Sequence, residues 1–389
     1  MSYKVRFVEP AKVYRMMKEE LDAAYFEVMT KGDLIDRGQL RQFEENLAAF
    51  VGTKYAVGLN SGYDALHMSL RAAGIGPGDE VIVPAHTFVA SASAVVNVGA
   101  KPVLVDVGKD FNIDADRIEE VLESAIRNPQ SAIKAIMPVH LNGYIADMVR
   151  IMEIAQKYNL VVVEDACQSL GSSMIAESSR LKAQSGEGER KKAGAWGLTG
   201  CWSFYPFKIL GGYGDGGAIT TNDPEVALFA TRMRYNGEDR KTGEYHGHGF
   251  TCLLDNLQAA FLDVKLRHLP KWIERRRGIA ERYRSALSDI PDLMLPHYND
   301  PRRDHVYQNY VVRAKQGDAF SDYLKNSGVE VLIQFRKPYY KHEALKLEDK
   351  GFPETEALSR EVCSLPMNVE ITDEEVEYVI GVIRSFYSK

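Results

Sequence analysis

The stretch from Gly200 to Gly217 reads G-C-W-S-F-Y-P-F-K-I-L-G-G-Y-G-D-G-G. It places a single lysine, Lys208, between an aromatic run typical of a strand and a loop that holds five glycines. A lysine held in a tight turn and shielded from water can have its pKa lowered enough to act as a nucleophile or to form a Schiff base. The segment alone also fits a hairpin tip that carries a solvated lysine. Only the rest of the sequence can show which of the two interpretations holds for Lys208.

The composition is that of an ordinary soluble globular protein. Of the 389 residues, 45% are hydrophobic and 26% are charged, and the chain is long enough to form two cores. The net charge of −6 comes from interspersed acidic and basic residues. This distribution gives no electrostatic footprint for nucleic acid or for an anionic membrane.

The spacing of the cysteines and the sequence of the N-terminus narrow the classes of protein that the chain fits. The four cysteines lie far apart without metal-ligand spacing, so we expect no metal site. The N-terminus carries charges where a signal peptide needs an apolar run, and no segment approaches the roughly 20 apolar residues of a membrane span. We therefore expect a cytoplasmic protein that acts on soluble molecules.

Short β-rich runs alternate with longer amphipathic runs from residue 55 to residue 222. The expected strands are Tyr55–Leu59, Glu80–Val83, Val103–Asp106, Lys134–Val139, Leu160–Glu164, Gly200–Phe204 and Gly217–Thr221. The expected helices between the first five strands are Asp64–Ala73, Val89–Val98, Ile118–Ile126 and Met148–Lys157. This order predicts an α/β fold with a mostly parallel sheet of seven strands, covered on both faces. Only the Lys208 loop separates the last two strands, so the final strand can run antiparallel.

Helical patterns flank this sheet in the sequence. Two helices precede it, with a break at Lys31–Asp33, and a long helical pattern from Leu254 to Leu287 leads away from it. A smaller α+β unit follows, with strands at Asn309–Arg313 and Val329–Gln334 and a closing helix at Asp373–Tyr387. We place the two domains at residues 1–265 and 266–389. The polar segment Ile175–Lys192 is expected to form an exposed loop.

Open parallel sheets bind ligands outside the carboxyl ends of their strands, so the residues at those ends are the candidates for a site. Ser61, Gly62 and Tyr63 follow the first strand and open a helix. A helix start of this kind suits a phosphate, although a serine there is also a common N-cap. Phe88 follows the second strand and can offer its face to a flat ring or pack in the core.

An acid and a hydroxyl follow two further strands. Asp165 comes at the end of the fifth strand, where an ionised carboxylate is costly unless a partner such as a protonated ring nitrogen holds it. It can also cap the next turn. Ser203, five residues before Lys208, can bind a phosphate or simply end a strand. A phosphate cradle, an aromatic face, an acid and a lysine together describe a site for pyridoxal 5′-phosphate (PLP).

Six motifs resemble those of the DegT/DnrJ/EryC1/StrS family of sugar aminotransferases and span roughly residues 10 to 385. They are N-S-G-Y-D-A-L, G-D-E-V-I-V-P-A-H-T-F-V-A-S, V-E-D-A-C-Q-S-L-G, the stretch around Lys208, L-D-N-L-Q-A-A-F-L and L-S-R-E-V-C-S-L-P-M. The resemblance implies the aspartate-aminotransferase-like fold (PLP fold type I) and a homodimer with active sites at the subunit interface.

The resemblance also implies roles for single residues. Lys208 is implied to bind the cofactor and to shuttle protons, and Asp165 to pair with the pyridinium. Gln168 is implied to lie beside the ring oxygen and Phe88 to stack on the ring. The implied phosphate contacts are Ser61, Gly62, Tyr63 and Ser203.

Two stretches depart from the family pattern. The family often has N-x-R shortly before L-D-x-x-Q-A-A, and this chain has Thr251 and Leu253 at those places. Thr251 is therefore the candidate for the hydroxyl that reaches the phosphate across the subunit interface. A frequent P-L-H is Pro338-Tyr339-Tyr340 here, a change that bears on the acceptor. The candidate substrate contacts, chosen by position, are Arg240, His246, His305, Tyr307, Arg336 and Tyr340.

The implied activity is ping-pong transamination in amino-sugar biosynthesis. L-glutamate gives its amino group to PLP, leaving pyridoxamine 5′-phosphate (PMP) and 2-oxoglutarate, and a nucleotide-linked keto-sugar then accepts the amine. An enzyme for a cyclitol or a sugar phosphate, and a PLP-binding regulatory protein without turnover, remain alternatives. A nicotinamide-dependent dehydrogenase also fits alternating strands and helices, but no G-x-G-x-x-G follows the first strand.

Overall fold

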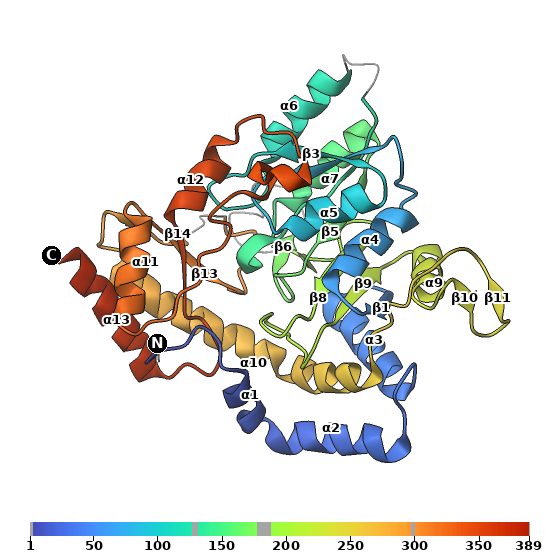
Figure 1. The fold of residues 1–389 in the computed structure, drawn as a ribbon, viewed down its shortest axis with the longest axis horizontal. Coiled ribbons are helices and arrows are strands. Elements are labelled where there is room, and N and C mark those ends of the chain that lie inside the picture. Colours follow the sequence, from blue (N-terminus) through green and yellow to red (C-terminus); the bar gives the residue numbers. More distant parts are fainter. Residues whose placement is uncertain (1–2, 127–130, 177–187, 297–299, 389) are drawn as a thin grey trace.

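A sheet of seven strands forms the centre of the computed structural model, which describes residues 3–126, 131–176, 188–296 and 300–388 (Figure 1). The strand order is β1-β9-β8-β5-β4-β2-β3. The strands are β1 (Tyr55–Leu59), β2 (Glu80–Pro84), β3 (Lys101–Val105), β4 (Ile133–Ile136), β5 (Val161–Asp165), β8 (Thr199–Ser203) and β9 (Gly217–Thr221). Strand β9 is antiparallel to both of its neighbours, and the other pairs are parallel. The predicted fold class and the mostly parallel sheet are confirmed.

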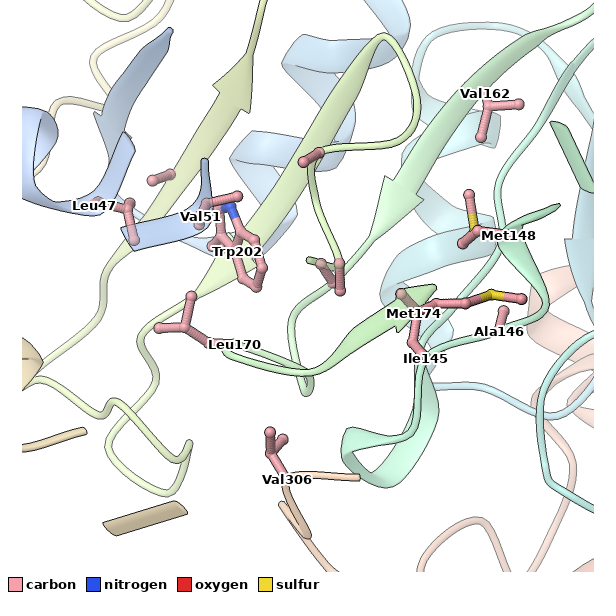
Figure 2. Close-up of a cluster of buried hydrophobic side chains, with 14 of the residues drawn as sticks. Leu47, Val51, Ile145, Ala146, Met148, Val162, Leu170, Met174, Trp202 and Val306 are labelled. Atoms are coloured by element: carbon pink, nitrogen blue, oxygen red, sulfur yellow. The ribbon is translucent and has the colours of Figure 1, made fainter. Parts of the chain in front are cut away.

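Alternate side chains of the strands enter two different cores. On one face, Ile82, Val162 and Trp202 pack with helices α3 (Gly38–Val51), α6 (Ala115–Ile126), α7 (Met148–Tyr158) and the first half of α10 (Asn256–Leu287). Figure 2 shows Trp202 of this face with Leu47, Val51 and Leu170 around it. On the other face, Val81, Val163 and Cys201 pack with α4 (Gly62–Ala72), α5 (Val89–Asn97) and α9 (Pro224–Met233). The period of two along each strand explains why the strand sequences are apolar almost throughout.

Three helices precede the sheet in the described part of the chain, and the third of them is α3. The first two are α1 (Pro10–Met16) and α2 (Lys18–Lys31), and α2 lies along the first part of α10 (Figure 1). Helix α2 ends at Gly32, whose φ of 67° is in the left-handed region that favours glycine. The predicted break at Lys31–Asp33 is therefore confirmed.

Helix α10 leads to the smaller C-terminal unit, as Figure 1 shows. This unit has an antiparallel sheet in the order β12-β13-β14, and this sheet, α11 and α13 pack with the second half of α10. The elements are β12 (Leu293–Met294), β13 (Tyr310–Ala314), α11 (Gly317–Asn326), α12 (Pro353–Glu361), β14 (Val362–Leu365) and α13 (Asp373–Tyr387). The predicted boundary at residue 265 falls inside α10, which contributes side chains to both cores.

Two sequence predictions need correction. Val329–Gln334 is not a strand, because it makes only single bridges, from Val329 to Val5 and from Leu332 to Ser364, and so divides its pairing between two neighbours. The segment Ile175–Lys192 is not a loop throughout, because β6 (Ser173–Ile175) pairs with β7 (Arg190–Lys192). Residues 177–187 of that segment lie outside the described residues.

Short elements complete the fold. Strands β10 (Glu238–Asp239) and β11 (Glu244–Tyr245) form a small hairpin. The described residues also form the short 3₁₀ turns η1 (Leu141–Gly143), η2 (Tyr339–Lys341) and η3 (Glu343–Leu345). Among the helices of the described ranges, none is both long and apolar enough to cross a membrane.

Candidate active site

Lys208 lies half-buried on the loop between β8 and β9. The loop is a tight turn: the N–H of Lys208 donates to the carbonyl of Tyr205 at 2.8 Å. The backbone at Gly211 packs so closely that a Cβ atom there would lie 2.3 Å from the carbonyl oxygen of Pro206. Lys265 of α10 donates from Nζ to the carbonyl of Gly211 at 2.6 Å. The glycines therefore allow backbone segments of the loop to pack closely against each other. The hydrogen bond from Lys265 of α10 fixes the position of the loop.

Asp165 is buried, with 6% of its surface exposed, at the carboxyl end of β5. Its Oδ2 accepts a hydrogen bond from Ser91 Oγ at 2.8 Å, and its Oδ1 accepts one from the N–H of Cys167 at 3.3 Å. Within the described part of the chain, no Lys, Arg or His forms an ion pair with this carboxylate. A buried carboxylate that lacks a cationic side chain fits a protonated ring nitrogen as its partner.

The predicted phosphate residues meet at the N-terminus of α4. Ser61 is its N-cap, and its Oγ accepts from the N–H of Asp64 at 3.0 Å, so the capping role is present. A Cβ atom on Gly62 would lie 2.7 Å from Cβ of Ser203 and 2.9 Å from Sγ of Cys167. The structure thus brings Ser61, Gly62 and Ser203 together, and the N–H groups of the first helical turn are free of intrahelical partners. This arrangement suits a phosphate group.

Asp165 and Lys208 stand at the same edge of the sheet. Strands β5 and β8 are parallel neighbours, Asp165 ends β5, and Lys208 lies on the loop that follows β8. Burial raises the pKa of the Cys167 thiol, close to this edge, well above its ordinary value; Asp165 raises that pKa further and Lys208 opposes the rise.

A cleft of about 680 Å³ opens beside Lys208. Gln168 lines it, and Oε1 of this side chain accepts from the N–H of Asn142 at 2.8 Å. The N-terminal segment, residues 3–10, lines the same cleft together with Asn309 and Gln334. The volume is in the range of small-molecule sites. The cleft has room for a substrate beside Lys208, and the carboxylate of Asp165 and the helix start at Ser61, at the neighbouring strand ends, fit PLP.

Phe88 and Thr251 lie at the periphery. Phe88 precedes α5 and is 59% exposed, which rules out the alternative of core packing and leaves its ring free to face a ligand. Tyr63, in the first turn of α4, hydrogen-bonds through its hydroxyl to Asn97. Thr251 is exposed and donates from Oγ1 to Oδ1 of Asn236 at 3.1 Å.

The structure places the six candidate substrate contacts outside this cleft. Of the described residues that line it, none is one of the six. His305 and Tyr307 stack on each other, with ring centroids 3.9 Å apart, and line a separate cavity of about 300 Å³. Arg240 pairs with Asp36, Arg336 pairs with Asp318, His246 is exposed and Tyr340 is buried against Phe352. Their contact with substrate stays a prediction.

Sequence reasoning missed Ser91 and the N-terminal segment. Ser91 lies in the first turn of α5, three residues after Phe88, and only the packing of α5 against α4, β2 and β3 brings it to Asp165. The N-terminal segment reaches the cleft because the N–H groups of Lys4 and Val5 both donate to the carbonyl of Gly328. Neither contact leaves a signal in the local sequence pattern.

The chain is similar to a family of known proteins and to several of their solved structures. The sequence model of the DegT/DnrJ/EryC1/StrS aminotransferase family matches residues 15–384. A protein of Geobacillus stearothermophilus named pleiotropic regulatory protein is 36% identical and matches over 98% of each chain. The dTDP-3-amino-3,4,6-trideoxy-alpha-D-glucose transaminase of Streptomyces venezuelae is 35% identical, over 98% of this chain and 96% of that protein. The crystal structure of NtdA from Bacillus subtilis with bound cofactor PMP has a TM-score of 0.86 at 28% identity, covering 100% of this chain and 86% of the other.

Proposed function

The chain belongs to the DegT/DnrJ/EryC1/StrS aminotransferase family, and we propose that it transfers an amino group from L-glutamate to a nucleotide-linked keto-sugar. It is an enzyme that depends on PLP, and its role lies in amino-sugar biosynthesis. The observation that supports the proposal is that Asp165 at the end of β5 and Lys208 after the parallel strand β8 stand at one edge of the sheet, where Gly62 at the start of α4 packs against Ser203. A carboxylate, an amine and a phosphate cradle at one sheet edge match the parts of one cofactor.

Each part of the site has a distinct chemical task. When bound, PLP supplies the electron sink that lets an amine pass from donor to acceptor. The carboxylate of Asp165 keeps the ring nitrogen protonated, and Ser91 orients that carboxylate. Nζ of Lys208 takes a proton from Cα of the amino donor and returns one when the acceptor is aminated. The α4 N-terminus and Ser203 bind the phosphate, so the cofactor keeps its place while the amine is exchanged.

The proposed enzyme acts as a homodimer. Met16, Phe26, Leu34 and Ile35 lie on α1, on α2 and in the segment after it, and each is between 46% and 60% exposed. Apolar side chains exposed in such a group suit contact with a second copy of the chain. In that dimer Thr251, Arg240 and His246 are candidates to reach the cleft of the partner subunit, since they lie outside the cleft of their own.

The activity is tested by visible absorbance of the purified protein with PLP, before and after L-glutamate is added. We expect wild-type protein to show a PLP band that glutamate bleaches, with 2-oxoglutarate formed in equal amount, and Lys208→Ala to form none. A set of nucleotide-linked keto-sugars then identifies the acceptor by the return of the band. A protein that does not bind PLP would overturn the proposal. A protein that binds PLP without any turnover would instead favour a regulatory role, as the name of the Geobacillus relative suggests for that protein.

The dimer is tested separately by light scattering of wild-type protein and of a Phe26→Glu, Leu34→Asp double variant. We expect a dimer for the wild type and a monomer for the double variant, because two buried carboxylates without partners oppose association. A wild-type monomer under all conditions would contradict this part of the proposal.

A further inference from the structure

Gln308 makes two hydrogen bonds to the peptide groups on either side of Lys208. Its Oε1 accepts from the N–H of Ile209 at 2.6 Å, and its Nε2 donates to the carbonyl of Phe207 at 2.9 Å. Only 8% of the Gln308 surface is exposed. The two backbone groups fix which end of the amide is which, because an N–H requires an acceptor and a carbonyl requires a donor. A single side chain of the C-terminal unit thus holds the peptide groups before and after the lysine.

The backbone that carries Gln308 is itself held in place. Arg276 of α10 is buried and donates from one terminal nitrogen to the carbonyl of Tyr307 at 2.9 Å and to that of Gln308 at 3.4 Å. Tyr307 has a φ of 52°, in the left-handed region, which a residue with a side chain keeps only when its surroundings enforce it. The path from α10 to Gln308 and on to the Lys208 loop is therefore continuous and rigid.

The two bonds have no substitute in the loop. Ile209 is buried, so its N–H has no access to water once Gln308 is removed, and an unpaired buried donor is costly. The backbone of the loop would then rotate until that N–H donates to another acceptor. Because Lys208 lies between the two held peptide groups, any such rotation moves its side chain.

We propose that Gln308 is a positioning residue for Lys208, fixing the direction in which Nζ reaches into the cleft. The inference rests on the proposed function and adds that the C-terminal unit, through Gln308, determines how well the lysine transfers its proton. Gln308 also lines the cleft, and in this role it acts through the backbone of the Lys208 loop. Its removal should affect the chemical step rather than the binding of the amino donor.

The test uses Gln308→Met, which keeps the length of the side chain and removes both hydrogen bonds. We expect kcat of the glutamate half-reaction to fall about ten- to hundred-fold, since a displacement of the order of 1 Å costs that much. KM for glutamate should change less than kcat, because the two lost hydrogen bonds hold the loop of Lys208. The rate at which cofactor-free protein captures PLP, followed by absorbance, should fall in parallel, because the same amine must reach the aldehyde.

A double-mutant cycle separates positioning from general loss of stability. In a Lys208→Ala background, with methylamine added to stand in for the missing amine, Gln308→Met should cause no further decrease in rate. The matched control is Tyr283→Phe, which removes another buried hydrogen bond of the C-terminal unit, from the hydroxyl to the carbonyl of Pro366 at 3.0 Å. This control should lower the melting temperature and leave kcat unchanged.

The outcomes distinguish the two proposals. A folded Gln308→Met protein with the kcat and PLP capture rate of the wild type would overturn the positioning role, and so would an equal decrease in the wild-type and Lys208→Ala backgrounds. If Gln308→Met does not fold, Gln308→Glu, which keeps the acceptor for Ile209 and loses the donor to Phe207, should give an intermediate kcat. A wild-type level of kcat in that variant would also overturn the role. Failure of the wild-type protein to bind PLP concerns the proposed function instead.

Discussion

Ser91 on α5 donates a hydrogen bond of 2.8 Å to Oδ2 of Asp165 at the end of β5. Ser91 is fully buried and also lies 3.1 Å from the hydroxyl of Thr87, so the two hydroxyls and the carboxylate form a chain. Since the Ser91 hydroxyl donates to the carboxylate, it accepts from Thr87. This chain fixes the direction of the carboxylate, as a partner for a protonated ring nitrogen must be fixed.

The first prediction concerns Ser91. Ser91→Ala should lower the free energy of unfolding by about 1–3 kcal/mol, the usual range for a hydrogen bond to a charged group. It should also lower kcat about ten-fold, because the carboxylate loses a group that orients it. Urea unfolding and half-reaction kinetics measure the two effects. Ser359→Ala removes a local hydrogen bond in α12 and should leave kcat unchanged; equal kinetics for Ser91→Ala and wild type would contradict the assignment.

The second prediction concerns the charge of Asp165. Asp165→Asn keeps an oxygen for Ser91 but loses the negative charge, so the ring nitrogen is no longer held protonated. We expect kcat to fall about hundred-fold or more, in line with the loss of a group that controls a proton. The circular dichroism spectrum should match that of the wild type. Burying a carboxylate costs desolvation free energy, so replacing it by a neutral amide should not destabilise the fold. Unchanged kinetics would remove the proposed role of Asp165.

The elements of the sheet could be predicted because each strand is buried on both faces and each helix has an apolar side. Strands β1 and β9 agree with their predicted bounds residue for residue. One failure lies where pairing partners are distant: Val329–Gln334 carries the apolar pattern of a strand but contacts two separate segments. A local hydrophobic pattern indicates that a segment is buried, but it does not indicate how many other segments pair with it.

The residues of the candidate site also include some that the sequence could predict and some that it could not. Lys208, Asp165 and Ser61 could be predicted because they stand at strand ends or at a helix start, positions that the sequence marks. Gln308 and Ser91 could not, because each acts on a residue that is distant in sequence, 99 residues for the bond from Gln308 to Ile209 and 74 for Ser91 and Asp165. Tertiary packing alone brings such pairs together.

The third prediction concerns the close packing at Gly62. Gly62→Ala would place a Cβ atom 2.7 Å from Ser203 and 2.9 Å from Cys167, so the α4 N-terminus must move away from the end of β8. We expect overpacking of this kind to cost about 1–3 kcal/mol of stability and to weaken PLP binding at least about ten-fold. Gly278→Ala is the control, because no atom lies within 4 Å of the added Cβ and the site is inside helix α10. That change should raise stability slightly. Fluorescence titration with PLP compares the two variants, and equal affinities would contradict the packing argument.

The fourth prediction concerns acid stability and His86. Burial lowers the pKa of His86 to about 4, with Arg313 adding to the decrease and Asp106 opposing it. Above about pH 6.5, the pKa of a histidine in the unfolded chain, the ring is neutral in both states and contributes no pH dependence. Below that value the unfolded chain binds a proton that the folded protein does not bind until about pH 4, so stability is lost as the pH falls.

The expected loss from His86 is about 1.4 kcal/mol per pH unit between about pH 6 and pH 4. His86→Leu removes this contribution, so the variant should lose less stability than the wild type between pH 7 and pH 5, whatever its stability at pH 7. Urea unfolding at several pH values, followed by circular dichroism, gives the two slopes. Parallel slopes would show that His86 is protonated equally in the folded and unfolded states, which its burial against Phe335, with ring centroids 5.3 Å apart, argues against.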